Sequence, residues 1–352
     1  MAIADAVIKH SIDLQHYSNG VVRRIIALLN RVDPDLFARL TAALETMPLE
    51  SFTVERLEAL LGSVRQLNRQ AYEQATAALE RELRDFAAVE VEWQQAFFRR
   101  QITSTFVSVT AEQVYSAALS RPFQGRLLRE WSQGIEANRM ARIRDAVRIG
   151  YVSNETIPQI VRRIRGTRAR QYKDGLLEID RRHAETVVRT AISHTAGVTR
   201  DRFVEANLDI VDAVVWLSTI DGVTSAPCRL RDQLRYTAED HKPIGLRVPW
   251  GAGPGRLHFN CRSVSLPLLR GQDELFGTRA SADGQVDANL SYGEWLKRQP
   301  AEVQDEVLGP TRGKLLRAGK LTMDRFYNDR GRYLTLDELR ERNATAFERA
   351  GL

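Results

Sequence analysis

The sequence predicts a mostly α-helical protein of the α+β class, in which a small antiparallel sheet is set among helices. Two observations predict this class. Apolar residues recur at spacings of three and four over most of the first 206 residues, which is the period of an amphipathic helix. Beyond them, short β-branched runs alternate with a period of two. We therefore expect a long N-terminal helical arm or bundle, a central helical region with the small sheet, and a short helical C-terminal unit.

Length and composition restrict the class of protein. The chain has 352 residues, of which 43% are hydrophobic and 27% charged, and this is typical of a multi-domain globular protein. Its net charge of +6 permits a polyanionic partner without requiring one. No apolar run approaches the roughly 18 residues that cross a bilayer, and no signal-peptide pattern is present. We expect a soluble protein of a reducing cytoplasm, without a membrane partner.

The N-terminal region, residues 1–101, is expected to be helical. Asp33 followed by Pro34 has the pattern of an N-cap with proline at the first helical position, and it predicts a helix that starts there and ends near residue 44. A longer amphipathic helix is expected over about 57–88. Such helices pack against each other in a bundle or against a partner chain.

The central region, residues 102–206, begins with an extended connector and continues as helices with breaks near residues 150 and 166. Between residues 139 and 182, twelve Lys and Arg face five Asp and Glu, a net charge of +7 that exceeds that of the whole chain. Clustered guanidinium groups displace counterions from nucleic acid, so double-stranded DNA is a candidate partner. A solvated helix face and an acidic protein surface are the alternatives. The candidate DNA-binding residues are Arg162, Arg163, Arg165, Arg168 and Arg170.

The third region, residues 207–270, carries the sheet. A β-rich strand is expected at 212–218 and a second at 262–268, with a loop rich in proline and glycine between them. The fourth region, residues 271–352, is expected to hold a linker at 277–289 and a last helical unit.

One group of residues has the chemistry of a site. Asp221, Cys228, His258 and Cys261 flank the loop, and pairing of the two strands should bring them together. Two thiolates, an imidazole and a carboxylate suit zinc. A disulfide between the cysteines, a Cys/His/Asp nucleophile and a structural loop closed by a hydrogen-bonded His258 are the alternatives. We assign no catalytic residue and no cofactor, with zinc as the open alternative.

The residues between 189 and 269 resemble one known family. Trp216-x-Ser218-Thr219-x-Asp221 follows a helix, and the loop ends in His258-x-x-Cys261-Arg262. This pair of motifs resembles the Mu F-like head-morphogenesis domain, which is found in minor capsid proteins of tailed bacteriophages. The residues that match the family motif are Trp216, Asp221, Thr224, Cys228, His258, Cys261 and Arg262.

The chain departs from the family pattern at three positions. Some members have Cys-x-x-Cys and Cys-Arg-Cys, which supply four candidate thiolates, whereas Ser225 and Ser263 stand at the first and last of these positions here. The usual Asp-Gly step is Asp232-Gln233. The two serines weaken the zinc site that the resemblance implies.

The resemblance implies a non-enzymatic, low-copy protein of the phage head that acts in procapsid assembly and in DNA packaging or delivery. The implied partners are the portal protein and other capsid or scaffold proteins, and the implied location is the virion, reached from the host cytoplasm. The alternative is a Cys/His-dependent enzyme or toxin-like effector carried in the head.

Overall fold

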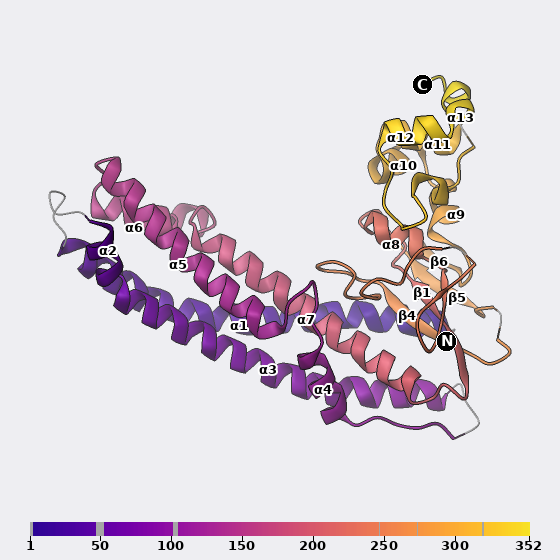
Figure 1. The fold of residues 1–352 in the computed structure, drawn as a ribbon, viewed down its shortest axis with the longest axis horizontal. Helices are drawn as coiled ribbons and strands as arrows, with labels where there is room; N and C mark the ends of the chain where they lie inside the picture. Colours follow the sequence, from indigo (N-terminus) through magenta and orange to yellow (C-terminus); the bar gives the residue numbers. More distant parts are fainter. Residues whose placement is uncertain (1–2, 47–52, 101–104, 246, 273, 319) are drawn as a thin grey trace. The chain divides into compact units, whose positions relative to one another are not determined.

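A computed structural model describes residues 3–46, 53–100, 105–245, 247–272, 274–318 and 320–352. Within them are thirteen α-helices and six short strands, which confirms a mostly helical α+β fold (Figure 1). None of the helices in these ranges is long and apolar enough to cross a membrane.

The chain forms two compact units, which we describe separately. The bundle unit comprises His16–Val89 and Ala111–Thr195, and the sheet unit comprises Met1–Gln15, Glu90–Thr110 and Ala196–Leu352. The four regions expected from the sequence stay a prediction, and their first boundary, at residues 101 and 102, lies outside the described residues.

The bundle unit is built from long amphipathic helices. Its core joins Leu36, Leu40, Ile143 and Ile164, each fully buried. Three of the helices, α1, α3 and α7, continue along the chain into the sheet unit. The helices that contribute to the bundle unit are α1 (Ile3–Glu45), α2 (Val54–Leu60), α3 (Gly62–Arg99), α4 (Ala111–Ser120), α5 (Leu128–Val152), α6 (Ile157–Arg165) and α7 (Leu177–Glu205).

The helix start predicted at Asp33 is wrong, because α1 continues without a break through Pro34. The Asp33 carboxylate does not cap a helix. It accepts hydrogen bonds from Arg139 on α5 and Arg181 on α7, both at 2.7 Å. A partner from another helix therefore satisfies the oxygen atoms that an N-cap would use locally.

The predicted helix over 57–88 is present but longer and divided. It begins as α2, where the Thr53 hydroxyl accepts the Arg56 amide at 3.2 Å, and resumes as α3, which ends at Arg99. Residues 105–110 have no regular structure, and α4 begins at Ala111. The rest of the expected connector, at 102–104, lies outside the described residues.

The sheet unit contains a four-stranded antiparallel sheet of order β3-β2-β1-β4. The two strands expected from the sequence are β1 and β4, and they pair with Val214 opposite Pro267. All of β1 except Asp212 is buried, which explains its nearly continuous apolar run. The strands are β1 (Val211–Leu217), β2 (Arg235–Thr237), β3 (Pro243–Ile244) and β4 (Val264–Leu269).

The linker expected at 277–289 is wrong, because this segment forms a β-hairpin of β5 (Thr278–Ser281) and β6 (Gly284–Asp287). Short helices follow and bury Tyr292, Leu296 and Phe326 against Ile220 and Leu230 from the sheet region. The sheet unit also includes α8 (Ala226–Arg231), α9 (Tyr292–Lys297), α10 (Ala301–Leu308), α11 (Pro310–Arg317), α12 (Leu336–Arg342) and α13 (Ala344–Ala350).

Candidate metal centre

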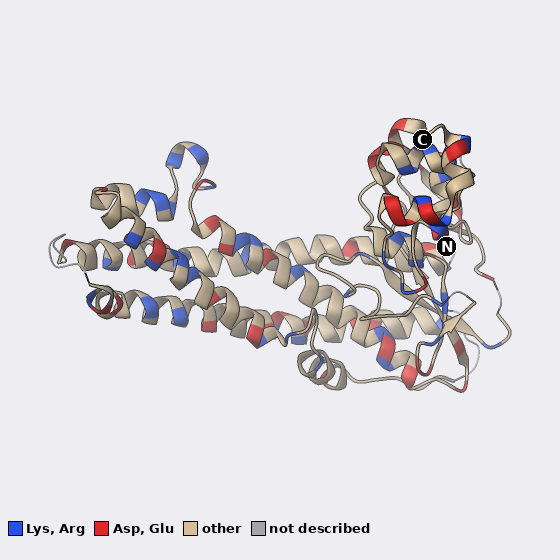
Figure 2. Cartoon of the chain, turned by 45° about the horizontal axis from the view of Figure 1, so that its top comes forward, with Lys and Arg blue, Asp and Glu red and all other residues tan. Residues whose placement is uncertain are grey.

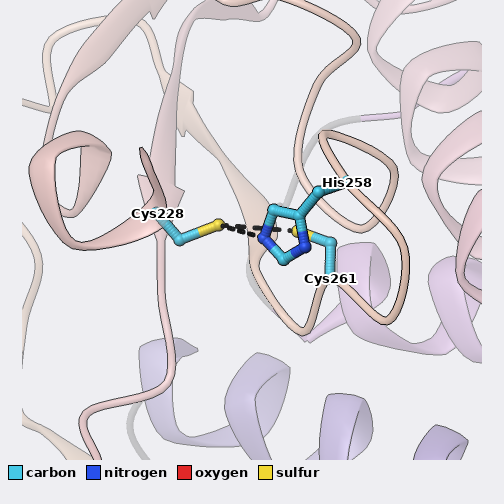
Figure 3. Close-up of side chains that lie close together, drawn as sticks. All are labelled: Cys228, His258 and Cys261. Atoms are coloured by element: carbon cyan, nitrogen blue, oxygen red, sulfur yellow. Dashed lines mark hydrogen bonds between the residues drawn. The ribbon is translucent and has the colours of Figure 1, made fainter. Parts of the chain in front are cut away.

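Three of the four predicted site residues meet in the sheet unit. Cys228 lies on α8, and His258 and Cys261 lie on the loop that leads into β4. The two sulfur atoms are 3.6 Å apart, and Cys228 Sγ is 3.2 Å from His258 Nε2 (Figure 3). All three potential ligand atoms lie within 4.8 Å of one another. We call Cys228, His258 and Cys261 the cysteine cluster.

The pairing of β1 with β4 holds the two cysteine-bearing segments together. Ser218 directly follows β1, and its hydroxyl donates to the Cys228 carbonyl at 2.9 Å. The same hydroxyl lies 3.0 Å from the Ser263 hydroxyl, directly before β4. The sequence motif included Ser218, but nothing in the sequence showed that it joins α8 to the loop.

The orientation of the His258 ring is fixed by its neighbours. Nδ1 lies 2.8 Å from the Phe259 carbonyl oxygen, and because a carbonyl only accepts, Nδ1 carries a proton. Nε2 therefore faces the sulfur of Cys228 and the hydroxyl of Ser225, which is 2.6 Å away. In the neutral ring this leaves the Nε2 lone pair directed at the cluster, as metal ligation requires.

Hydrogen bonds within the cysteine cluster shift the pKa values of its members in different directions. The hydrogen bond between the two sulfur atoms raises the pKa of Cys228 and lowers the pKa of Cys261 well below its ordinary value. The hydrogen bond with Cys261 also raises the pKa of His258. Within the cluster, Cys228 therefore keeps its proton more readily than Cys261, and His258 keeps its proton more readily than an ordinary histidine.

The dimensions of the cluster fit a metal ion. A tetrahedral zinc with Zn–S bonds of about 2.3 Å and Zn–N bonds of about 2.0–2.1 Å places its sulfurs about 3.8 Å apart and its S and N about 3.6 Å apart. The observed 3.6 and 3.2 Å are close to these values. They are far from the roughly 2.05 Å of a disulfide, so both cysteines are free. Cys228, His258 and Cys261 could therefore hold a metal ion.

Asp221 is not part of the cysteine cluster, contrary to the expectation that it converges with the other three. Arg262 donates to both of its carboxylate oxygens, and the Thr224 hydroxyl donates to Oδ1 at 3.0 Å. Burial alone would raise the pKa of Asp221, but the hydrogen bonds from Arg262 outweigh it and hold that pKa below its ordinary value. The carboxylate is thus committed to an ion pair, and Ser225 contacts the cluster in its place.

A second ion pair, which is fully buried, lies in the same region of the sheet unit. Asp232 and Arg279 are both fully buried, and the guanidinium donates to the two carboxylate oxygens at 2.9 and 2.6 Å. Asp232 also accepts the backbone amides of Ser218 and Tyr292, each at 2.8 Å. No pattern in the sequence indicates Arg279, because it lies in the segment whose composition predicts a linker.

Trp216 belongs to the core of the sheet unit. It is fully buried, and its indole meets the ring of Trp250 edge to face, with centroids 5.2 Å apart. Its Nε1 donates to the Ser218 hydroxyl at 3.1 Å. This family-motif residue therefore positions the end of β1 through packing.

The predicted DNA-binding arginines lie in the bundle unit, and they differ in their surroundings. Arg163 pairs with Glu155, and Arg165 donates to the Tyr172 hydroxyl at 3.3 Å. Arg162, Arg168 and Arg170 are exposed and form no ion pair within the described residues.

The motif residues singled out in the sequence thus all lie in the sheet unit, on or next to β1, α8 and the loop that leads into β4. No protein-family model, curated protein or solved structure matches this chain. Membership of the Mu F-like family stays a prediction from the motif residues.

Proposed function

We propose that this protein is a structural component of a tailed-bacteriophage head, of the Mu F-like minor capsid type. One observation carries the proposal. The two halves of the motif, separated by the long loop, interlock through the Asp221–Arg262 ion pair and through Ser218, whose hydroxyl contacts both the Cys228 carbonyl and Ser263. These polar residues of the motif are engaged in contacts that join the two segments.

The departures from the family pattern also support the proposal. Gln233, at the position of the usual glycine, has a φ of +70°, the left-handed conformation that favours glycine. Ser225 and Ser263, at the positions of the extra thiolates, both hydrogen-bond to Cys228 and partly offset the rise in its pKa that the hydrogen bond with Cys261 and burial cause. Each substituted residue thus occupies the conformation or the place that the family residue would need.

In this proposal the protein acts in procapsid assembly and in DNA packaging or delivery. Its partners are the portal protein and other capsid or scaffold proteins, and its location is the virion. It catalyses no reaction.

We also propose that the metal is zinc, held by Cys228, His258 and Cys261. When bound, zinc supplies a cross-link between α8 and the loop. Cys228 and Cys261 are only 2% and 1% exposed, whereas His258 is partly buried. Three protein ligands leave the fourth position of a tetrahedral zinc unassigned, and the burial of the two cysteines limits the access of water to it.

The experiment is a protein inventory of purified phage particles by mass spectrometry. Peptides of this chain should be found at low copy in procapsids and in mature particles. Arg262→Ala, which breaks the interlock, should reduce incorporation, whereas Arg332→Ala, which breaks an exposed ion pair with Glu338, should not. Absence of the unchanged chain from both kinds of particle would refute the proposal.

The alternative, a Cys/His-dependent enzyme or effector, is favoured by the 3.2 Å contact between Cys228 Sγ and His258 Nε2. An accessible activated thiolate is alkylated quickly by iodoacetamide at neutral pH, whereas a buried structural thiol reacts slowly. We expect slow labelling of both cysteines in the native, metal-free chain. Rapid labelling of either one would favour the enzyme.

A further inference from the structure

The connection between α6 and α7 is a loop whose conformation is fixed by internal hydrogen bonds and close backbone packing. Gly166 and Gly175 close its base, where their backbones pack so tightly that a Cβ atom on Gly166 would lie 2.7 Å from the Gly175 nitrogen. Gly166 also has a φ of +87°, which disfavours any side chain. We call residues 166–175 the arginine loop.

The only acidic residue of the loop is exposed, and its carboxylate is engaged in hydrogen bonds within the loop. Asp174 accepts both the amide and the hydroxyl of Thr167, each at 2.8 Å, and Tyr172 donates its amide to the Thr167 carbonyl at 2.8 Å. The Arg165 guanidinium lies over the Tyr172 ring, 4.8 Å from its centroid. These contacts fix the base of the loop and cover one face of its one aromatic ring.

The exposed charged side chains of the loop are three cations and one acid, Asp174. Arg168 and Arg170 stand on the short 3-10 turn η2 (Arg168–Arg170), and Lys173 follows. All three are exposed, as is Arg162 at the end of α6, and none forms an ion pair within the part of the chain that the structure describes. In Figure 2 this turn is the blue segment that rises from the helices of the bundle unit.

The backbone of the loop is held in an unfavourable conformation. Gln171 and Tyr172, two successive residues with side chains, have φ values of +53° and +62°. Such left-handed residues persist only where the surrounding contacts enforce them, and they concentrate at functional sites. Here they fold Tyr172 back onto Arg165 while the cationic side chains stay outside.

We propose that the arginine loop, together with Arg162, is a docking surface for the phosphodiester backbone of duplex nucleic acid. Guanidinium groups bind phosphate through paired hydrogen bonds. Four cations that form no ion pair within the described residues gather here beside one exposed acid, Asp174, whose carboxylate already accepts two hydrogen bonds from Thr167. Single-stranded nucleic acid is disfavoured, because it is bound by stacking on free aromatic rings and the ring of Tyr172 already carries the Arg165 guanidinium on one face. An acidic protein is disfavoured because the loop has no large apolar side chain to anchor an interface.

This inference stands on the loop alone and does not rest on the proposed function. It also refines the set of arginines that the sequence indicated. Arg163 and Arg165 are engaged within the protein, so the phosphate contacts belong to Arg162, Arg168, Arg170 and Lys173.

The test is binding of a fluorescent DNA duplex to the full chain, followed by anisotropy from about 50 to about 200 mM salt. Each phosphate contact contributes about −0.9 to the slope of log K against log salt concentration. The combined variant Arg168→Ala, Arg170→Ala and Lys173→Ala should therefore flatten the slope by about 2.7. No measurable binding of the unchanged chain at the lowest salt would overturn the proposal.

A matched control removes the same charge elsewhere in the bundle unit. Arg23, Arg31 and Arg39 on α1 are exposed and form no ion pair within the described ranges. Replacing all three with alanine should leave the slope within about one unit of its original value. An equal effect of the two triple variants would mean that net charge and not the arginine loop governs binding, and the proposal would be lost.

Two further measurements separate geometry and partner from charge. Asp174→Ala makes the chain more positive but removes the contacts that close the loop, so we expect weaker DNA binding. Tighter binding would contradict a role for the fixed conformation of the loop.

Poly-glutamate of equal charge should compete poorly with the duplex. If it competes as well as unlabelled duplex, the surface fits an acidic protein and the nucleic-acid proposal is wrong.

Discussion

Arg262 donates to both carboxylate oxygens of Asp221, at 2.6 and 2.8 Å, across 41 residues of chain. Each side chain is 25% exposed, so the pair is only partly screened by water. Asp221 precedes α8 and Arg262 directly follows Cys261. The ion pair therefore ties together the two segments that carry the cysteine cluster.

The first prediction concerns how the contribution of the Asp221–Arg262 ion pair to stability depends on pH. The pKa of Asp221 lies below its ordinary value, so the pair stabilises the fold above the unfolded-state pKa and loses this contribution as pH falls through the folded-state pKa. Asp221→Asn should lower the free energy of unfolding by about 1–2 kcal/mol at pH near 7 and by less near pH 3. Urea unfolding at the two pH values measures both effects. Asp13→Asn, at an exposed residue of α1, should change neither, and an Asp221 variant as stable as the parent at neutral pH would contradict the prediction.

The second prediction concerns the fully buried pair of Asp232 and Arg279. Arg279→Met would leave a carboxylate buried with only backbone amides to stabilise it. We expect a loss of about 3–5 kcal/mol in the free energy of unfolding, measured by urea denaturation. Arg332→Met breaks the exposed pair with Glu338 and should have little effect. Equal effects of the two variants would show that burial does not govern the contribution of these ion pairs.

The third prediction concerns the strain at Gln233. Its left-handed backbone costs about 1–2 kcal/mol, and its side chain donates to the Ala288 carbonyl at 2.7 Å. Gln233→Ala loses the hydrogen bond and keeps the strain, whereas Gln233→Gly loses both. The glycine variant should therefore be more stable than the alanine variant by about 1 kcal/mol in thermal or urea unfolding.

The order of the two variants should reverse in an ordinary helix. At Gln133, an exposed position inside α5, alanine should be more stable than glycine by about 1 kcal/mol. If alanine is also the more stable residue at position 233, the left-handed conformation there is not the source of strain.

The sequence predicted the elements whose signals are local and missed those decided by distant partners. The β-rich run of β1 and the alternation in β4 were sufficient to place both strands. The start of a helix at Asp33 failed because arginines 106 and 148 residues away take up its carboxylate. The β5–β6 hairpin was missed because its segment is rich in glycine, aspartate and serine, and because its buried Arg279 depends on Asp232, 47 residues earlier.

In the candidate site, too, the sequence predicted what depends on local signals and missed what depends on distant residues. Cys228 and Cys261 flank two strands that pair, so their approach could be expected from the sequence. Asp221 is equally compatible with metal ligation and with an ion pair, and only the position of Arg262 in space decides between them. The contact of Ser225 with His258 had no signal in composition or spacing.

The last prediction follows from that contact. Ser225 Oγ lies 2.6 Å from His258 Nε2, so Ser225→Cys should place a third sulfur beside the cysteine cluster. If the cluster binds zinc, the variant should bind it more tightly by on the order of tenfold, which equals about 1.4 kcal/mol, because thiolate is a far better zinc ligand than a serine hydroxyl. Competition with a chromophoric chelator under reducing conditions gives the affinities, and Cys261→Ser should abolish binding. Ser63→Cys, at an exposed position of α3, adds a thiol away from the cluster and should leave the affinity unchanged. An equal gain at both serines, or zinc binding that survives Cys261→Ser, would show that the metal is held elsewhere.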